Sequence, residues 1–136
     1  MTINVELRDE QAARLDRFAT GLRKSRVEAT AQLIEEGLRR AEFPAIEFRD
    51  SAAGRQAYVV GSGLAVWEIL MVAEGYGLDP DSTAQHLQLD RDRVSQALRY
   101  ASAFESEVLQ ALDENRSMTA EKLRASLPPA AWIDVP

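Results

Sequence analysis

The sequence predicts a mainly helical protein made of two modules, and three observations support this. Apolar residues first alternate near the N-terminus, at Ile3, Val5 and Leu7. Apolar residues then recur at three- and four-residue steps over two segments, which is typical of amphipathic helices. After Pro44 the pattern changes to short strand-like pieces followed by short helical ones. We therefore expect a strand-helix-helix module followed by a small helical domain with a short β-hairpin.

The first element is expected to be a half-buried strand, because alternation with period two places side chains on opposite faces. Asp9 would end this strand and cap a first helix, which runs to about Thr20 and ends at Gly21. Ser25 is a favourable cap for a second helix. The apolar face of that second helix would comprise Val27, Thr30, Ala31, Ile34 and Leu38.

A strand with two helices cannot fold alone, because its backbone has no pairing partner and forty residues bury little apolar area. The simplest solution is a homodimer in which the strands of two copies pair antiparallel. Ile3, Val5 and Leu7 would then cover the helices, and Thr2, Asn4 and Glu6 would project outward. A two-stranded ribbon of this width fits the major groove of B-DNA.

The strand INVEL, the following helix, the turn GLRKSR and the helix opened by Ser25 resemble the ribbon-helix-helix family, the fold of the Arc, MetJ and CopG repressors. The resemblance covers roughly residues 2 to 40. It implies that the strand residues read operator DNA and that Ser25 and Arg26 contact a phosphate. An alternative is a dimerisation ribbon without a role in DNA binding. The predicted DNA-binding residues are Thr2, Asn4, Glu6, Arg8, Arg23, Lys24, Ser25 and Arg26.

The charge is distributed unevenly along the 136 residues, whose net charge is −6. Residues 1–40 contain eight basic and seven acidic side chains, whereas residues 41–136 contain eight basic and fifteen acidic ones. The acidic part could favour a basic protein partner. The chain has no cysteine, no apolar run of transmembrane length and no recognisable signal peptide, so we expect a soluble cytoplasmic protein without membrane contact.

We expect a ribbon module over residues 1–41, a linker over residues 42–45 and a helical domain over residues 46–115. Pro44 cannot continue a helix, which supports the linker. Ile46–Phe48 and Gln56–Val60 would form a loose hairpin. Glycines 61 and 63 predict a tight turn before a helix that starts near Leu64, and Asp81 would cap a short helix ending at Leu87.

The spacing of Ala84, Gln88 and Val94 is typical of a helix-turn-helix, in which a small residue lets two helices cross closely. The turn position is usually glycine, and here it is Gln88. One interpretation is a second DNA contact, and the other is a three-helix core with a solvated polar face. The residues of this possible contact are Arg91, Arg93, Gln96 and Arg99.

The stretch RQAYVVGSGLAVWEIL and the later RYASAFESEVLQAL resemble the homeodomain-like domain of VapB-type antitoxins. This resemblance covers residues 46 to 113. It implies an antitoxin or a regulator of one, with a PIN-like ribonuclease toxin as partner. It implies no set of binding residues.

Residues 116–136 are predicted to form a partner-binding tail, with a short helix from Thr119 to Leu127 that Pro128 and Pro129 end. An apolar segment of this length cannot bury itself, and tryptophan is frequent at protein interfaces. The alternative is that the tail folds back on its own domain or on a dimer mate. The predicted toxin-binding residues are Leu123, Leu127, Trp132, Ile133 and Val135.

Two functions fit these observations: an antitoxin that also represses transcription, and a stand-alone ribbon-helix-helix repressor with a helical oligomerisation or sensing domain. An enzyme is the least favoured class. His86 is the single histidine and is expected to be structural, and we find no nucleophile-base set, metal motif or phosphate loop. We expect neither catalytic residues nor a cofactor.

Overall fold

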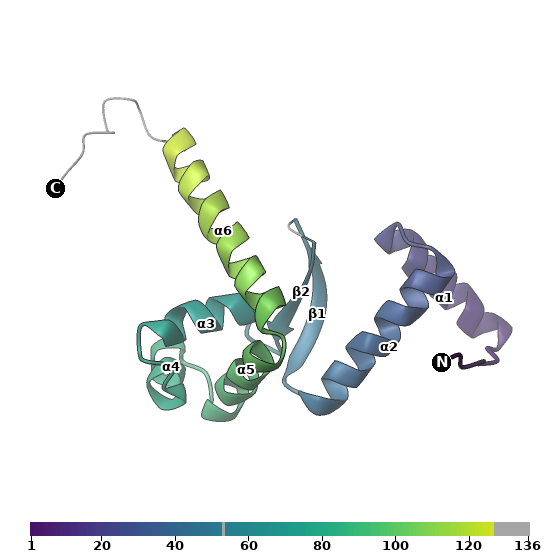
Figure 1. Cartoon of the computed structure of the whole chain (residues 1–136), viewed down its shortest axis with the longest axis horizontal. Coiled ribbons are helices and arrows are strands. Elements are labelled where there is room, and N and C mark those ends of the chain that lie inside the picture. The colour runs from purple at the N-terminus through teal and green to yellow at the C-terminus, as the bar shows by residue number, and fades with distance from the viewer. Residues whose placement is uncertain (53, 127–136) are drawn as a thin grey trace. The chain divides into compact units, whose positions relative to one another are not determined.

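The computed structural model describes residues 1–52 and 54–126, with side chains described as far as Arg116. The chain divides into two compact units, residues 1–44 and residues 45–136. The described residues are mainly helical and contain one two-stranded antiparallel sheet, as the sequence predicts (Figure 1). In the described part of the chain, no helix is long and apolar enough to cross a membrane.

The first unit contains α1 (Asp9–Leu22) and α2 (Arg26–Glu42), which pack against each other. Residues 1–8 precede them without regular secondary structure. The predicted strand is therefore not formed within the single chain. The physical reason is that a strand needs a neighbour for its backbone hydrogen bonds, and the first unit offers none.

The ends of α1 differ from the prediction by a few residues. The cap is Arg8 rather than Asp9, and the Arg8 backbone N–H donates to Gln11 Oε1 at 3.1 Å. The helix continues through Gly21 and ends where Arg23 adopts a left-handed conformation with φ 56°. The backbone N–H groups of residues 23 and 24 then bond carbonyl oxygens in the last turn, which closes the helix as a glycine would.

The predicted cap of α2 is confirmed. Ser25 Oγ accepts from the Glu28 backbone N–H at 3.1 Å, and the Glu28 carboxylate accepts from the Ser25 backbone N–H at 3.3 Å. This reciprocal pair is a capping box and satisfies two backbone donors at the start of the helix.

The second unit begins with a hairpin of β1 (Ile46–Ser51) and β2 (Gly54–Val59), in which Ile46 lies opposite Val59. The first strand extends the predicted piece Ile46–Phe48 to Ser51, and the second begins two residues before the predicted Gln56 and ends at Val59, one residue before the predicted Val60. The Val60 N–H donates to the Ala45 carbonyl at 2.8 Å, so the end of the expected linker is fixed to the hairpin. Gly61 and Gly63 take φ values of 73° and 69°, which form the predicted tight turn.

Three helices follow: α3 (Val66–Glu74), α4 (Pro80–Leu87) and α5 (Arg91–Ala103). The predicted starts of both of the first two helices were wrong by two residues, because α3 begins at Val66 rather than near Leu64 and α4 is capped by Asp79 rather than Asp81. Pro80 explains the latter, since proline is favoured at the first helical position. The core is formed where α3, α5 and α6 meet, and its largest fully buried residues include Ile69, Val94, Tyr100 and Leu112.

The last element is α6 (Glu105–Ser126), a continuous helix of 22 residues. It begins beside α5 and extends beyond the other helices of its unit (Figure 1). The prediction of a separate short helix from Thr119 was wrong in this respect. The segment contains neither glycine nor proline, so nothing in it ends the helix that starts at Glu105.

Candidate functional site

The first unit exposes an unusual amount of apolar side-chain area. Ile3 and Val5 are 72% and 71% exposed, which is the opposite of what their alternating pattern predicts for a folded strand. The exposed apolar side chains of this unit include Ile3, Val5, Leu7, Val27, Leu33, Ile34 and Leu38. We call these seven residues the N-terminal apolar surface. Contiguous apolar surface on a soluble protein marks an interaction site.

A groove of about 490 Å³ lies within this surface. Leu7 closes one side, and side chains of α1 and α2 form the remainder, namely Gln11, Arg14, Leu15, Phe18, Thr30, Leu33 and Ile34. The groove is lined mainly by apolar atoms, so an apolar segment bound in it would remove this surface from water, which is favourable. The groove therefore fits an apolar side chain from another polypeptide.

The polar residues predicted to read DNA lie on the same N-terminal segment. Thr2, Asn4 and Glu6 are all exposed, in alternation with the apolar residues. Arg8 caps α1, and its guanidinium pairs with Glu10 at 3.1 Å. The segment thus presents three polar side chains at every second position, with one cation at its end.

The turn between α1 and α2 holds the other predicted DNA contacts. Arg26 forms two parallel hydrogen bonds to Asp16, at 2.8 and 2.7 Å, and this interaction lowers the pKa of Asp16. Lys24 donates to Gln32. An anion at this helix end would therefore first meet the backbone amides of residues 26 and 27, because the first-turn amides have no partner within the helix.

In the second unit, α4 and α5 are joined by a tight turn at the predicted positions. Ala84 is buried where α4 approaches α5, and Val94 is fully buried at the start of α5. Gln88 takes the left-handed conformation, with φ 56°, that glycine usually supplies. The Leu89 N–H donates to the Ala84 carbonyl at 3.0 Å and closes the turn.

The side chains proposed for a second DNA contact are mostly engaged within the unit. Arg93 donates to the Val60 carbonyl at 2.8 Å, and Gln96 Oε1 accepts from the Ala45 N–H at 2.8 Å. Arg91 pairs with Asp81 at 2.7 Å, whereas Arg99 is exposed. The expectation of four exposed polar residues is therefore wrong for Arg93 and Gln96, which connect α5 to the hairpin.

A second groove, of about 590 Å³, lies between α3, α5 and α6. Its apolar lining includes Leu70, Leu78, Leu98 and Leu109, and Arg99 lies at the same groove. Leu78 is 53% exposed and has a positive φ of 63°, which side chains rarely adopt. Sequence reasoning missed this groove because its residues come from segments far apart in the chain.

The predicted toxin-binding residues lie at the end of the chain. Leu123 belongs to α6, but its side chain is not among those described. Leu127, Trp132, Ile133 and Val135 fall outside the described residues. His86 is exposed, and its Nδ1 lies 2.8 Å from the Tyr76 hydroxyl. Within the part that the structure describes, no group of three or more His, Cys, Asp or Glu side chains could hold a metal ion.

No family model, curated protein or solved structure matches this chain.

Proposed function

We propose that this chain is the antitoxin of a toxin-antitoxin pair. In this proposal its N-terminal segment forms a dimeric ribbon that binds operator DNA, and its C-terminal part neutralises a PIN-like ribonuclease toxin. The proposal combines the resemblances in the sequence with the surfaces of the two units.

The observation that carries the proposal is the exposure of Ile3, Val5 and Leu7, of which Leu7 also lines an apolar groove. Full burial of one Val or Ile side chain stabilises a structure by about 1.5–3 kcal/mol. A second copy would supply both the missing strand partner and the cover for the groove. Dimerisation would then arrange Thr2, Asn4 and Glu6 of both copies on one outer face.

The role in DNA binding rests on these exposed polar residues and on the basic turn. An asparagine can form a bidentate contact with adenine, and a carboxylate can accept from cytosine. Asn4→Ala is therefore expected to reduce operator affinity by about 1–3 kcal/mol, while leaving the dimer intact. The affinity would be measured by titration against operator DNA. If a dimeric Asn4→Ala variant binds with unchanged affinity, the ribbon does not make the base contacts.

The protein-binding role is tested by co-purification. The chain would be expressed together with its neighbouring genes and captured through an N-terminal tag. A small nuclease in stoichiometric amount is the expected companion. Deletion of residues 117–136 should abolish capture but keep the fold, because the deletion retains Val108 and Leu112, the buried residues of α6. A folded homodimer without a companion would contradict the antitoxin role.

A second function is favoured by one observation, the apolar groove between α3, α5 and α6. Its volume falls within the range of about 300–1,000 Å³ that is common for small-molecule sites. The chain would then be a stand-alone repressor whose helical domain senses a ligand. Saturable, groove-specific binding of a small apolar molecule that changes operator affinity would favour this function.

A further inference from the structure

An ion pair joins the two helices of the first unit at the basic turn between them. Arg26 Nε donates to Asp16 Oδ1 at 2.8 Å, and Arg26 Nη2 donates to Asp16 Oδ2 at 2.7 Å. Two parallel bonds of this kind match one edge of a guanidinium to both oxygens of a carboxylate. The hydrogen bond from Arg26 lowers the pKa of Asp16, so its carboxylate is ionised at neutral pH. We call this contact the Asp16–Arg26 pair.

The Asp16–Arg26 pair is open to solvent. The side chains of Asp16 and Arg26 are 49% and 61% exposed. An exposed ion pair contributes little to stability, because water and salt screen the two charges. A role in holding the fold together therefore does not account for the carboxylate at this position, and a ligand from solution can reach Arg26.

The pair reduces the positive charge that the turn offers to a DNA backbone. Residues 23–28 carry one acidic side chain and three basic ones, which are Arg23, Lys24 and Arg26. Arg23 is exposed, and Lys24 donates to Gln32, whose side chain is uncharged. Of the three cations, Arg26 is the one whose charge is neutralised by two hydrogen bonds from a carboxylate.

A phosphate at this turn would meet an arginine that is already paired. The Asp16 carboxylate occupies the guanidinium edge formed by Nε and Nη2. A phosphate that approached the remaining Nη1 edge would be repelled by this carboxylate on the other side. Phosphate contacts increase DNA affinity because cations release the counterions that DNA has bound. An arginine already neutralised by a carboxylate contributes little to this release.

We infer that Asp16 withholds Arg26 from the DNA backbone and thereby sets the affinity of the basic turn for phosphate. Asp16 is a positioning residue, because it acts on DNA through Arg26. The inference rests on the proposed function, which assigns the basic turn to DNA binding. Since a phosphate contact carries no sequence information, Asp16 affects the binding of every duplex rather than the choice between them.

The inference is tested with Asp16→Asn and two labelled duplexes of equal length, followed by fluorescence anisotropy. One duplex comes from the region upstream of the chain's own gene, and the other has the same bases in scrambled order. Both should bind at least about fivefold more tightly at about 0.1 M salt, because each protomer gains a phosphate contact. The plot of log affinity against log salt concentration should become steeper by about two for a dimer. A loss of structure would instead weaken binding.

A double-mutant cycle shows whether Asp16 acts through Arg26. In the Arg26→Gln chain, Asp16→Asn should change the affinity by less than about twofold, because no guanidinium remains to be released. An equal gain in the presence and absence of Arg26 would show that Asp16 acts by simple repulsion of DNA. That result would overturn the inference.

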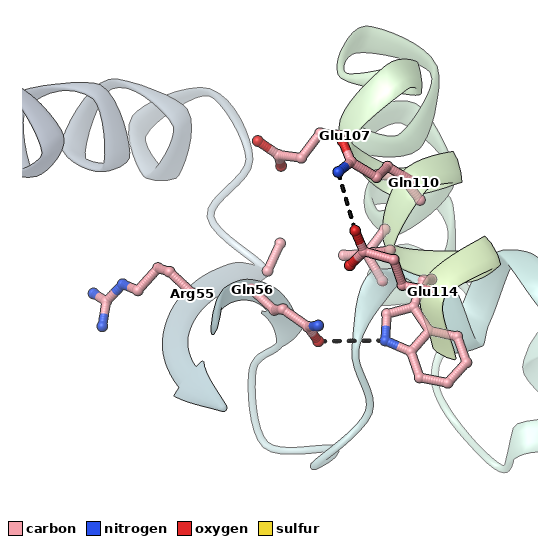
Figure 2. A pocket seen from close by; sticks show the side chains of 10 residues that line it. Arg55, Gln56, Glu107, Gln110 and Glu114 are labelled. Atoms are coloured by element: carbon pink, nitrogen blue, oxygen red, sulfur yellow. Dashed lines mark hydrogen bonds between the residues drawn. The ribbon is translucent and has the colours of Figure 1, made fainter. Parts of the chain in front are cut away.

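Two control substitutions remove the same charge elsewhere. Asp9→Asn changes an exposed carboxylate of α1 that pairs with no arginine among the described residues. Glu114→Gln changes a carboxylate of the second unit, which accepts from Gln110 Nε2 at 3.0 Å (Figure 2). Each should tighten binding by less than about twofold, owing to screening by salt. Circular dichroism would confirm folding, and Asp16→Ala is a second test variant because alanine favours a helix.

The inference is overturned if Asp16→Asn leaves both affinities unchanged, if it weakens them, or if the controls match it. Weaker binding would show that Asp16 orients Arg26 toward the phosphate. If the original chain prefers its upstream duplex and Asp16→Asn has no effect, the inference fails and the DNA-binding role stands. If neither duplex is preferred but Asp16→Asn tightens both, the inference stands and the operator role fails. If no duplex binds to either chain, both fail.

Discussion

Gln96 connects the start of the second unit to its central helix. Its side-chain oxygen accepts from the backbone of Ala45, which is itself buried. Gln96→Ala would leave that N–H without its partner, and an unsatisfied buried donor costs about 1–3 kcal/mol. We expect urea unfolding to show that the free energy of unfolding falls by this amount. Gln85→Ala is the control, because Gln85 is exposed on α4, and an equal loss in both variants would contradict this role.

Asp90 is a residue whose charge should make stability depend on pH. The hydrogen bonds from Arg93, through its side chain and its backbone N–H, lower the pKa of Asp90 below its ordinary value of 3.8. A lowered pKa in the folded state contributes stability above the ordinary value, and this contribution is lost as the pH falls through the lowered folded pKa. Asp16, Glu28 and Asp79 are shifted in the same direction.

Asp90→Asn should therefore lower the unfolding midpoint at neutral pH, although asparagine is also a good helix cap. The difference between the variant and the original chain should shrink as the pH falls below about 4, because the carboxyl is then protonated first in the unfolded state and, at still lower pH, in the folded state. Thermal unfolding followed by circular dichroism at several pH values would measure this. A difference that is the same in acid and at neutral pH would show that the charge is not responsible.

At the scale of elements, the turn between α4 and α5 can be tested by changing its sterically disfavoured residue. Gln88 has φ 56°, which costs a residue with a Cβ about 1–2 kcal/mol relative to glycine. Gln88→Gly should therefore stabilise the second unit by about 1 kcal/mol. The same change at Gln85, inside α4, should destabilise it by about 1 kcal/mol. If Gln88→Gly also destabilises the chain, the left-handed turn is not formed in solution.

The elements that could be predicted are those whose signals are local. Ser25 was predicted as a cap from its residue type, and the paired glycines predicted the turn before α3. The predicted ends of α1 and the predicted cap of α4 were wrong. Several neighbouring residues could cap α4, and Arg23 adopts a backbone conformation that its residue type does not suggest.

The candidate site could be predicted only in part, because some of its contacts join residues that are far apart in the sequence. The alternation of Thr2, Asn4 and Glu6 with apolar residues is a local pattern, but it does not predict that Ile3 and Val5 are exposed as well. The intramolecular bonds of Arg93 and Gln96 join residues 33 and 51 positions apart, so no local pattern indicates them.

At the scale of the whole molecule, the oligomeric state is the property most sensitive to the N-terminal apolar surface. Val5→Asp would introduce a charge where two copies are proposed to bury apolar side chains, and an unpaired buried charge is strongly unfavourable. We expect the variant to be monomeric at concentrations where the original chain is a dimer in analytical ultracentrifugation. Asn4→Asp is the control, because the neighbouring position faces the other side. A dimer that survives Val5→Asp would require a different interface.

Because α6 is one unbroken helix, it fixes how far its last residues lie from the core and in which direction they face. Leu112 is buried in the core, and Ser126 lies fourteen residues later on the same helix, about 21 Å further along its axis. Each inserted residue would advance everything beyond it by about 1.5 Å and rotate it by about 100°. A rigid partner that contacts both the core and the far end of α6 would still bind after an insertion of whole helical turns into α6, but less well after an insertion of a single residue. Recognition would then depend on the phase of the helix as well as on its sequence.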